Sequence, residues 1–296
     1  KFKKDMRNLV INKIHHLMKK NEKIFFLTAD MGINLVEIFE NDYPKRYLNV
    51  GIAEQNIISI VSVLANIGYI PVAYTISNFL IHRCFEQIRN DIVLHDYPIV
   101  LVGTSSGFDN ASLGPTHHVV DDWGCLKNFE NFEIYSPTSN AFATSMIEEV
   151  LINPRKCFFR LAKGDFSNFN ETKDFFYLEG DTVTKILYLS YGNLSKTLFD
   201  LHKNDKKNIL LLNKIHPIEN KELVEIFNRY DKILVVEDHF PSSGVYSSMC
   251  KLKNEHELKA GIIPLSPKNY DFNVGVNQEF YFKKNQIDYE SLKNIK

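Results

Sequence analysis

A single carboxylate, Glu54, stands at the entrance to a strongly apolar stretch of the chain. The segment reads GIAEQN from 51 to 56 and continues as IISIVSVLANIG. An ionised carboxylate at the start of a buried helix needs a partner, which can be the helix N-terminus, a hydrogen-bond donor or a bound ligand. The helix terminus alone stabilises such a group by about 0.3–1 kcal/mol, so position by itself favours this simple interpretation.

Three further residue types suited to chemistry follow apolar runs. Asp30 ends KIFFLTAD, Arg160 lies near the end of CFFRLA, and two adjacent histidines occur in GPTHHVVDD. Histidine titrates near neutral pH and can relay protons, whereas the arginine fork matches phosphate or carboxylate. Adjacent side chains diverge and no second ligand cluster occurs in the sequence, so we do not expect His117 and His118 to bind zinc.

Composition narrows the class of protein. The 296 residues are 44% hydrophobic and 24% charged, and the net charge is −1, from 35 basic and 36 acidic residues. This is typical of a globular protein and indicates neither a nucleic acid nor a membrane as partner. The four cysteines are far apart without a C-x-x-C motif, which favours a reducing compartment. No apolar run approaches the about 18 residues of a membrane span, and the N-terminus lacks a signal peptide's apolar core, so we expect a cytoplasmic location.

The elements that must position these residues form an α/β pattern. Short apolar runs such as YIPVAYT and YPIVLVG alternate with segments that predict helices at 5–20, 54–67, 80–95, 121–128 and 138–152. A second, smaller alternation predicts helices at 194–203, at 219–229 and after Gly244. Strand-length apolar runs between helices indicate parallel sheets covered on both faces. We therefore predict two doubly wound domains, 1–165 and 183–296, joined by a linker at 166–182.

In such folds, ligands bind beyond the carboxyl ends of the strands. That rule selects Asp30, the segment from Gly51 to Glu54, the loop after Val102 and the end of FFRLA. The sequence therefore places its chemistry-bearing residues on one edge of one sheet. This placement alone does not specify a reaction.

Several motifs together resemble a known family. TAD…RYLNVGIAEQN, FLIHRCFEQIRND, GPTHHVVDD and SPTSN…FFRL occur in the order found in the pyrimidine-binding half of transketolases. The C-terminal LSYG…ILLLNKIHPIE…ILVVEDH resembles that family's last domain, so the likeness covers nearly the whole chain. It is greatest to the C-terminal subunit of transketolases divided between two polypeptides. The expected activity is therefore transfer of a two-carbon ketol unit between sugar-type substrates, dependent on thiamine diphosphate.

The resemblance assigns the cofactor contacts. It implies that Glu54 hydrogen-bonds N1′ of the aminopyrimidine and so favours loss of the thiazolium C2 proton, and that Phe79 stacks on the pyrimidine ring. Asp30, Ile52 and Arg83 are expected beside the cofactor. At helical spacing Arg83 would pair with Glu86, and we expect that stretch at a subunit interface.

The resemblance also assigns the substrate side. His117 matches the family's active-site histidine, and Arg160 matches a substrate phosphate-binding arginine. Leu113 replaces the aspartate that usually precedes the glycine of G-P-T-H, and a leucine cannot accept a hydrogen bond from a hydroxyl. A second histidine that helps the family bind sugar phosphate has no counterpart here, and Thr104 or Ser105 lies near its place. These departures predict an altered acceptor, such as a ketose, a nucleotide-linked keto sugar or a less hydroxylated aldehyde.

The family's diphosphate and metal motif, Gly-Asp-Gly followed by a distant Asn, does not occur in this sequence; KGDF and EGDT lack the second glycine. No credible ligands for Mg²⁺ or Ca²⁺ replace it. We therefore expect a partner chain to hold the metal and diphosphate, in an obligate complex with two copies of each subunit.

Three alternatives stay open at this point. The β subunit of a 2-oxo-acid dehydrogenase or decarboxylase shares GIAEQ and the two-domain plan. 1-Deoxyxylulose-phosphate synthase is a further relative, although it is normally one long chain with its own metal motif. A non-catalytic scaffold that has kept the fold is the alternative from a different functional class.

Overall fold

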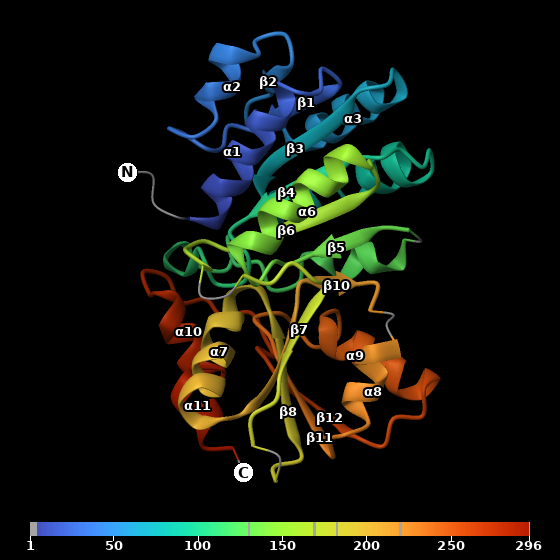
Figure 1. Ribbon diagram of the computed structural model, residues 1–296. Helices are drawn as coiled ribbons and strands as arrows, with labels where there is room; N and C mark the ends of the chain where they lie inside the picture. Colours follow the sequence, from blue (N-terminus) through green and yellow to red (C-terminus); the bar gives the residue numbers. More distant parts are fainter. Residues whose placement is uncertain (1–4, 130, 168–169, 182, 219–220, 296) are drawn as a thin grey trace.

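The computed structural model describes residues 5–129, 131–167, 170–181, 183–218 and 221–295. Two sheets, each flanked by helices, are stacked end to end along the molecule (Figure 1). The predicted α/β class is confirmed. The proposed linker at 166–182 and the first residues of the helix predicted at 219–229 lie partly outside the described residues.

The larger sheet has seven strands in the order β10–β5–β6–β4–β3–β1–β2. All neighbours are parallel except β10 and β5, which are antiparallel. The strands are β1 (Ile24–Thr28), β2 (Tyr47–Asn49), β3 (Ile70–Ile76), β4 (Val100–Thr104), β5 (Glu133–Tyr135), β6 (Cys157–Leu161) and β10 (Lys214–His216).

Helices cover both faces of this sheet because successive strand side chains point to opposite sides. Phe26 packs in a cluster with α1 (Met6–Met18) and α6 (Asn140–Ile152), whereas the next residue, Leu27, packs with α3 (Glu54–Asn66). Helix α3 ends before Gly68, whose φ of +93° is the left-handed conformation that favours glycine at a helix stop. This half also contains α2 (Glu37–Asp42), the 3-10 helix η2 (Ala111–Leu113) and the 3-10 helix η3 (Trp123–Asn128).

The smaller sheet has the order β12–β11–β8–β9–β7, parallel except for β7 against β9. Its strands are β7 (Phe175–Leu178), β8 (Ile186–Tyr191), β9 (Asn208–Leu212), β11 (Lys232–Val236) and β12 (Gly261–Leu265). One face carries α7 (Ser195–Asp205), α10 (Gln278–Lys284) and α11 (Tyr289–Lys293), and the other carries α8 (Lys221–Phe227) and α9 (Val245–Glu255) (Figure 1). A short 3-10 helix, η4 (Gly192–Leu194), precedes α7.

The two halves share a core. One cluster of buried side chains runs from Ile57 of α3 to Met249 of α9. Strand β10, which follows β9 in the chain, leaves the smaller sheet and pairs with β5 of the larger one. Among the described residues no helix combines the length and apolarity needed to cross a membrane.

Two local predictions are corrected by the structure. The helix predicted over 80–95 is divided into α4 (Ser77–Ile81), α5 (Phe85–Gln87) and a π-helix, η1 (Ile88–Val93). The helix predicted at 121–128 is the 3-10 helix η3. Because the helix is broken at 82–84, residues three apart across the break are not neighbours on one helix face, and this affects the ion pair of Arg83 described in the next subsection.

Candidate active site

The candidate site lies at the carboxyl edge of the larger sheet. The loops after β1, β2, β3 and β4 meet there because these strands are parallel neighbours. Asp30 follows β1, Glu54 follows β2, Phe79 follows β3 and His117 lies in the long loop after β4. The structure thus brings these four residues to one edge of the sheet, as expected from the sequence, whereas Arg160, which was expected there too, is buried.

Arg83 is in direct contact with both Glu54 and Phe79. Arg83 Nη1 donates to Glu54 Oε2 at 2.5 Å, and the guanidinium carbon lies 4.4 Å from the centre of the Phe79 ring. The Glu54 side chain is only 2% exposed, whereas that of Arg83 is 41% exposed. Within the described part of the chain nothing else donates a hydrogen bond to the Glu54 side chain, so Oε1 keeps its acceptor capacity.

Local backbone geometry explains how Glu54 comes to begin α3. Asn49 Oδ1 accepts from the backbone N–H groups of both Asp30 and Gly51, at 3.0 Å each, which ties the end of β1 to the turn before the helix. Gly51 adopts φ +72°, a conformation that few side chains tolerate. The N-cap residue, Ala53, offers no side-chain cap, so the first turn of α3 relies on Glu54 for a negative charge.

His117 completes the group through an edge-to-face contact with Phe79, with ring centres 5.4 Å apart. Its Nδ1 shares a hydrogen bond with Thr116 Oγ1 at 3.0 Å. Asn78 Nδ2 donates to the Thr116 backbone oxygen at 2.9 Å, which fastens this loop to α4. Its neighbour His118 is buried between rings, and burial lowers the pKa of that imidazole, so the two histidines occupy different environments.

The remaining predicted site residues fall into two groups. Asp30, Ile52 and Leu113 are exposed on the same edge; the Ile52 side chain is 78% and Leu113 54% exposed. Thr104 and Arg160 are fully buried. The two buried residues are corrections to the predicted substrate site, because the chain itself covers the groups that would have to reach a ligand.

The pairing predicted for Arg83 is also wrong. Among the described residues its ion-pair partner is Glu54 and not Glu86. The reason is the break between α4 and α5, since the i,i+3 argument holds only in a continuous helix. The sequence signal was limited to Glu54 itself, because a carboxylate at the start of an apolar helix needs a partner but its position does not say which one.

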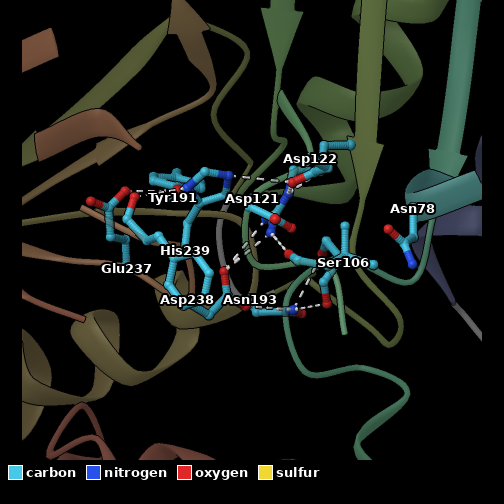
Figure 2. A network of polar contacts seen from close by, with 12 residues as sticks. Asn78, Ser106, Asp121, Asp122, Tyr191, Asn193, Glu237, Asp238 and His239 are labelled. Carbon is cyan, nitrogen blue, oxygen red and sulfur yellow. Dashed lines mark hydrogen bonds and ion pairs between the residues drawn. The ribbon is translucent and has the colours of Figure 1, made fainter. Parts of the chain in front are cut away.

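Arg160 instead joins the two halves of the molecule. Its Nε donates to both oxygens of Asp122, at 3.1 and 3.2 Å, and its Nη1 donates to Asp238 Oδ1 at 3.4 Å. Asn193 Nδ2 donates to Asp238 Oδ2 at 3.0 Å and to the Ser106 backbone oxygen at 2.9 Å. Figure 2 shows Asp122, Asn193 and Asp238 converging between the two halves. This network was not predicted from the sequence, and it fixes both ends of the loop that carries His117.

Burial perturbs several acids and bases around this network. Burial raises the pKa of Asp109 and of Glu237 to about 7, and raises that of Asp122, which Arg160 opposes. Burial, followed by the charge of Arg160, lowers the pKa of His239 well below its usual value. Its Nε2 has no hydrogen-bond partner among the described residues and lies 3.6 Å from Asp122 Oδ1.

The site has the features needed for a flat ring that donates hydrogen bonds. A buried carboxylate and a half-buried aromatic ring already hold a planar donor, the guanidinium of Arg83. In contrast, the described residues contain no group of three or more His, Cys, Asp or Glu side chains arranged to hold a metal ion. The geometry fits the aminopyrimidine end of a thiamine cofactor.

Comparisons with known proteins agree with this geometry. The family model for the transketolase pyrimidine-binding domain matches residues 2–167. One subunit of the apulose-4-phosphate transketolase of Actinobacillus succinogenes is 23% identical over 261 residues, which cover 85% of this chain and 84% of that protein. The 1-deoxy-D-xylulose-5-phosphate synthase of Syntrophus aciditrophicus is 24% identical over 299 residues, which cover 96% of this chain and 44% of the synthase. The chain thus spans less than half of that longer relative.

Two solved structures share the fold. A split-gene transketolase described as an inactive beta4 tetramer superposes with a TM-score of 0.83 at 19% identity, covering 98% of this chain and 96% of that one. The transketolase from Campylobacter jejuni superposes with a TM-score of 0.76 at 16% identity, covering 99% of this chain and 47% of that one.

Proposed function

The chain belongs to the transketolase pyrimidine-binding domain family, and on that premise we propose that it is the C-terminal subunit of a two-chain, thiamine diphosphate-dependent ketol transferase. The relative named as a transketolase subunit, matched over 85% of this chain and 84% of its own length, supports the divided arrangement. The observation that carries the proposal is the buried Glu54 carboxylate at the carboxyl edge of the sheet, which Arg83 connects to the Phe79 ring.

In this proposal Glu54 shares a proton with N1′ of the aminopyrimidine, and this nitrogen donates to the carboxylate when it carries that proton. Phe79 packs on the face of the ring. The chemistry supplied by bound thiamine diphosphate is that of an electron sink for cleaving and forming a carbon–carbon bond. The protein's share is to place an ionised acceptor in a water-poor setting, where a charge-assisted hydrogen bond is strong. The N-terminus of α3 places the positive end of the helix dipole beside the Glu54 carboxylate.

His117 is assigned to the substrate side. Its ring lies against Phe79 and belongs to a half-buried loop, so it can meet a substrate placed beside the cofactor ring. Histidine can donate or accept a proton at neutral pH, which suits contact with a substrate oxygen. With Arg160 committed to internal carboxylates, a phosphorylated substrate has to be held by other groups, from this chain or from its partner.

The diphosphate and its metal ion, Mg²⁺ or Ca²⁺, are assigned to an N-terminal partner chain. Two facts support this division: the Gly-Asp-Gly motif does not occur in the 296 residues of the sequence, and the described residues offer no acidic cluster for a cation. We propose that the cofactor bridges the two chains and that the assembly contains two copies of each.

A substitution at Glu54 tests the proposal. Glu54→Gln retains size and the ability to accept one hydrogen bond but removes the charge, and should lower kcat at least about 100-fold with the complex still assembled. Glu279→Gln is the matched control, because Glu279 also lies in the first turn of a helix but is exposed and pairs with Lys283. Thiamine diphosphate, Mg²⁺ and the candidate partner chain are supplied, and C2 proton exchange and ketol transfer are measured. Equal rates for Glu54→Gln and wild type would refute the proposal.

A second candidate is the C-terminal half of a divided 1-deoxy-D-xylulose-5-phosphate synthase. The specific observation in its favour is the synthase from Syntrophus aciditrophicus, which aligns with 96% of this chain. The two candidates use the same Glu54 and differ in product. Assaying the assembled complex for 1-deoxy-D-xylulose 5-phosphate and, separately, for ketol transfer from apulose 4-phosphate distinguishes them.

A further inference from the structure

Arg83 makes both contacts that the proposed function assigns to the aminopyrimidine ring. Its guanidinium is planar, donates to Glu54 Oε2 at 2.5 Å and lies 4.4 Å from the centre of the Phe79 ring. We propose that Arg83 is an internal occupant of the aminopyrimidine site, whose guanidinium must leave Glu54 and Phe79 before the ring binds. This inference rests on the proposed function and concerns how the same site is loaded.

The anchoring of the backbone at Arg83 allows its side chain to move alone. The backbone oxygen of Arg83 accepts from Gln55 Nε2 at 3.0 Å, which fixes the main chain beside α3. The guanidinium forms no ion pair with any described residue other than Glu54, and the side chain is 41% exposed. A change of rotamer toward solvent is therefore enough to open the site, with no movement of α4 or α5.

The burial of Glu54 explains why Arg83 occupies the site. A buried carboxylate without a partner is unfavourable, and Glu54 is 2% exposed. Arg83 supplies this positive charge when no ligand is bound. It follows that only a ligand able to donate a hydrogen bond to Glu54 compensates for the loss of Arg83, so the occupant selects against purely apolar rings.

The displacement weakens ligand binding by a modest factor. Partly exposed ion pairs and cation–π contacts each correspond to about a two- to fivefold change in a binding constant. Removing both should therefore make the site bind a free aminopyrimidine about five- to twentyfold more tightly. The binding free energy of the whole cofactor can exceed this loss, and a change in affinity of this size is measurable by titration.

The test uses thiamine, which carries the ring without the diphosphate, and the full chain. Affinities are measured by ligand-observed NMR for wild type, Arg83→Met, Arg83→Lys and Arg229→Gln. Methionine keeps the length of the side chain without its charge, and lysine keeps the charge without the planar fork. Arg229 is the control because it is exposed and follows α8, outside the candidate site, so its loss removes one positive charge without changing the contacts of Glu54 or Phe79.

Arg83→Met should bind thiamine about five- to twentyfold more tightly than wild type, with Arg83→Lys in between and Arg229→Gln unchanged. Adding Glu54→Gln to Arg83→Met should abolish the gain. A second readout needs no ligand: in urea unfolding, Glu54→Gln and Arg83→Met should be non-additive, because each removes the same ion pair.

Two results overturn the inference, and they differ in what they say about the proposed function. If wild type binds thiamine through Glu54 and Arg83→Met binds no more tightly, the occupant model is wrong and the proposed function stands. If no variant binds thiamine at all, the occupant model and the aminopyrimidine site fall together.

Discussion

Replacing Arg160 by methionine should destabilise the protein more than any substitution at a surface arginine. The guanidinium is fully buried between Asp122 and Asp238, whose side chains are 0% and 1% exposed. It also donates to the Val119 backbone oxygen at 2.7 Å. Methionine fills similar space but removes the guanidinium from two buried carboxylates and one carbonyl, and of the two carboxylates Asp238 keeps its hydrogen bond from Asn193.

The size of the effect follows from this burial. Removing one partner of a buried ion pair costs about 3–5 kcal/mol in the free energy of unfolding, because the remaining charge stays desolvated. The matched control is Arg155→Met. Arg155 pairs with Glu133 and Glu149, but its side chain is 29% exposed and water can replace it, so we expect a loss of about 1 kcal/mol.

The pH dependence makes the prediction specific. Burial raises the pKa of Asp122 in the folded protein, and the charge of Arg160 opposes that rise. In the variant this opposition is gone, so the pKa of folded Asp122 rises further above that of the unfolded chain. The deficit of the variant relative to wild type is then smallest in acid, where the group is protonated in both proteins. It grows as the pH rises from the folded pKa of wild type toward the higher folded pKa of the variant.

Urea unfolding of both variants and wild type between pH 5 and 8 provides the measurement. We expect the deficit of Arg160→Met relative to wild type to be larger at pH 8 than at pH 5, and that of Arg155→Met to be nearly constant. An Arg160→Met protein as stable as Arg155→Met at pH 8, or a deficit that grows on acidification, would contradict the reasoning.

Two other substitutions test the loop between β4 and η3. Gly107→Ala should lower the free energy of unfolding by at least about 2 kcal/mol, because Gly107 has φ +54° and a Cβ there would lie 1.7 Å from Asp238 Oδ2. Gly68→Ala is the control, because Gly68 is also at positive φ but faces open space, and it should lower the free energy of unfolding by only about 1 kcal/mol. Similar unfolding free energies for the two variants would count against the contact between the loop and Asp238. Leu113→Asp places a carboxylate on an exposed part of the same loop, so the free energy of unfolding should not change. The carboxylate can accept a hydrogen bond, so kcat/KM should shift in favour of acceptor aldehydes with an α-hydroxyl group. An unaltered acceptor preference in the assembled complex would remove Leu113 from the substrate site.

The sequence by itself determined the class of fold and the place of the key carboxylate. Alternating apolar runs predicted β3, β4 and β6, and a glycine stop predicted the end of α3 near Gly68, because these features depend on side-chain periodicity and local backbone preference. Glu54 was predictable for the same reason: it follows a turn and begins an apolar helix in one continuous segment.

Only the tertiary structure determined which charged side chains form ion pairs. Arg83 and Glu54 are 29 residues apart, and Arg160 and Asp238 are 78 apart, so neither pairing could be inferred from local spacing. Helical spacing favoured Glu86 as the partner of Arg83, and the break at 82–84 removed that option. Arg160 could not be recognised as buried because its burial depends on the second sheet, which brings Asp238 against the end of β6. Long-range packing sets the partner of each buried charge, and packing is not encoded in any single stretch of sequence.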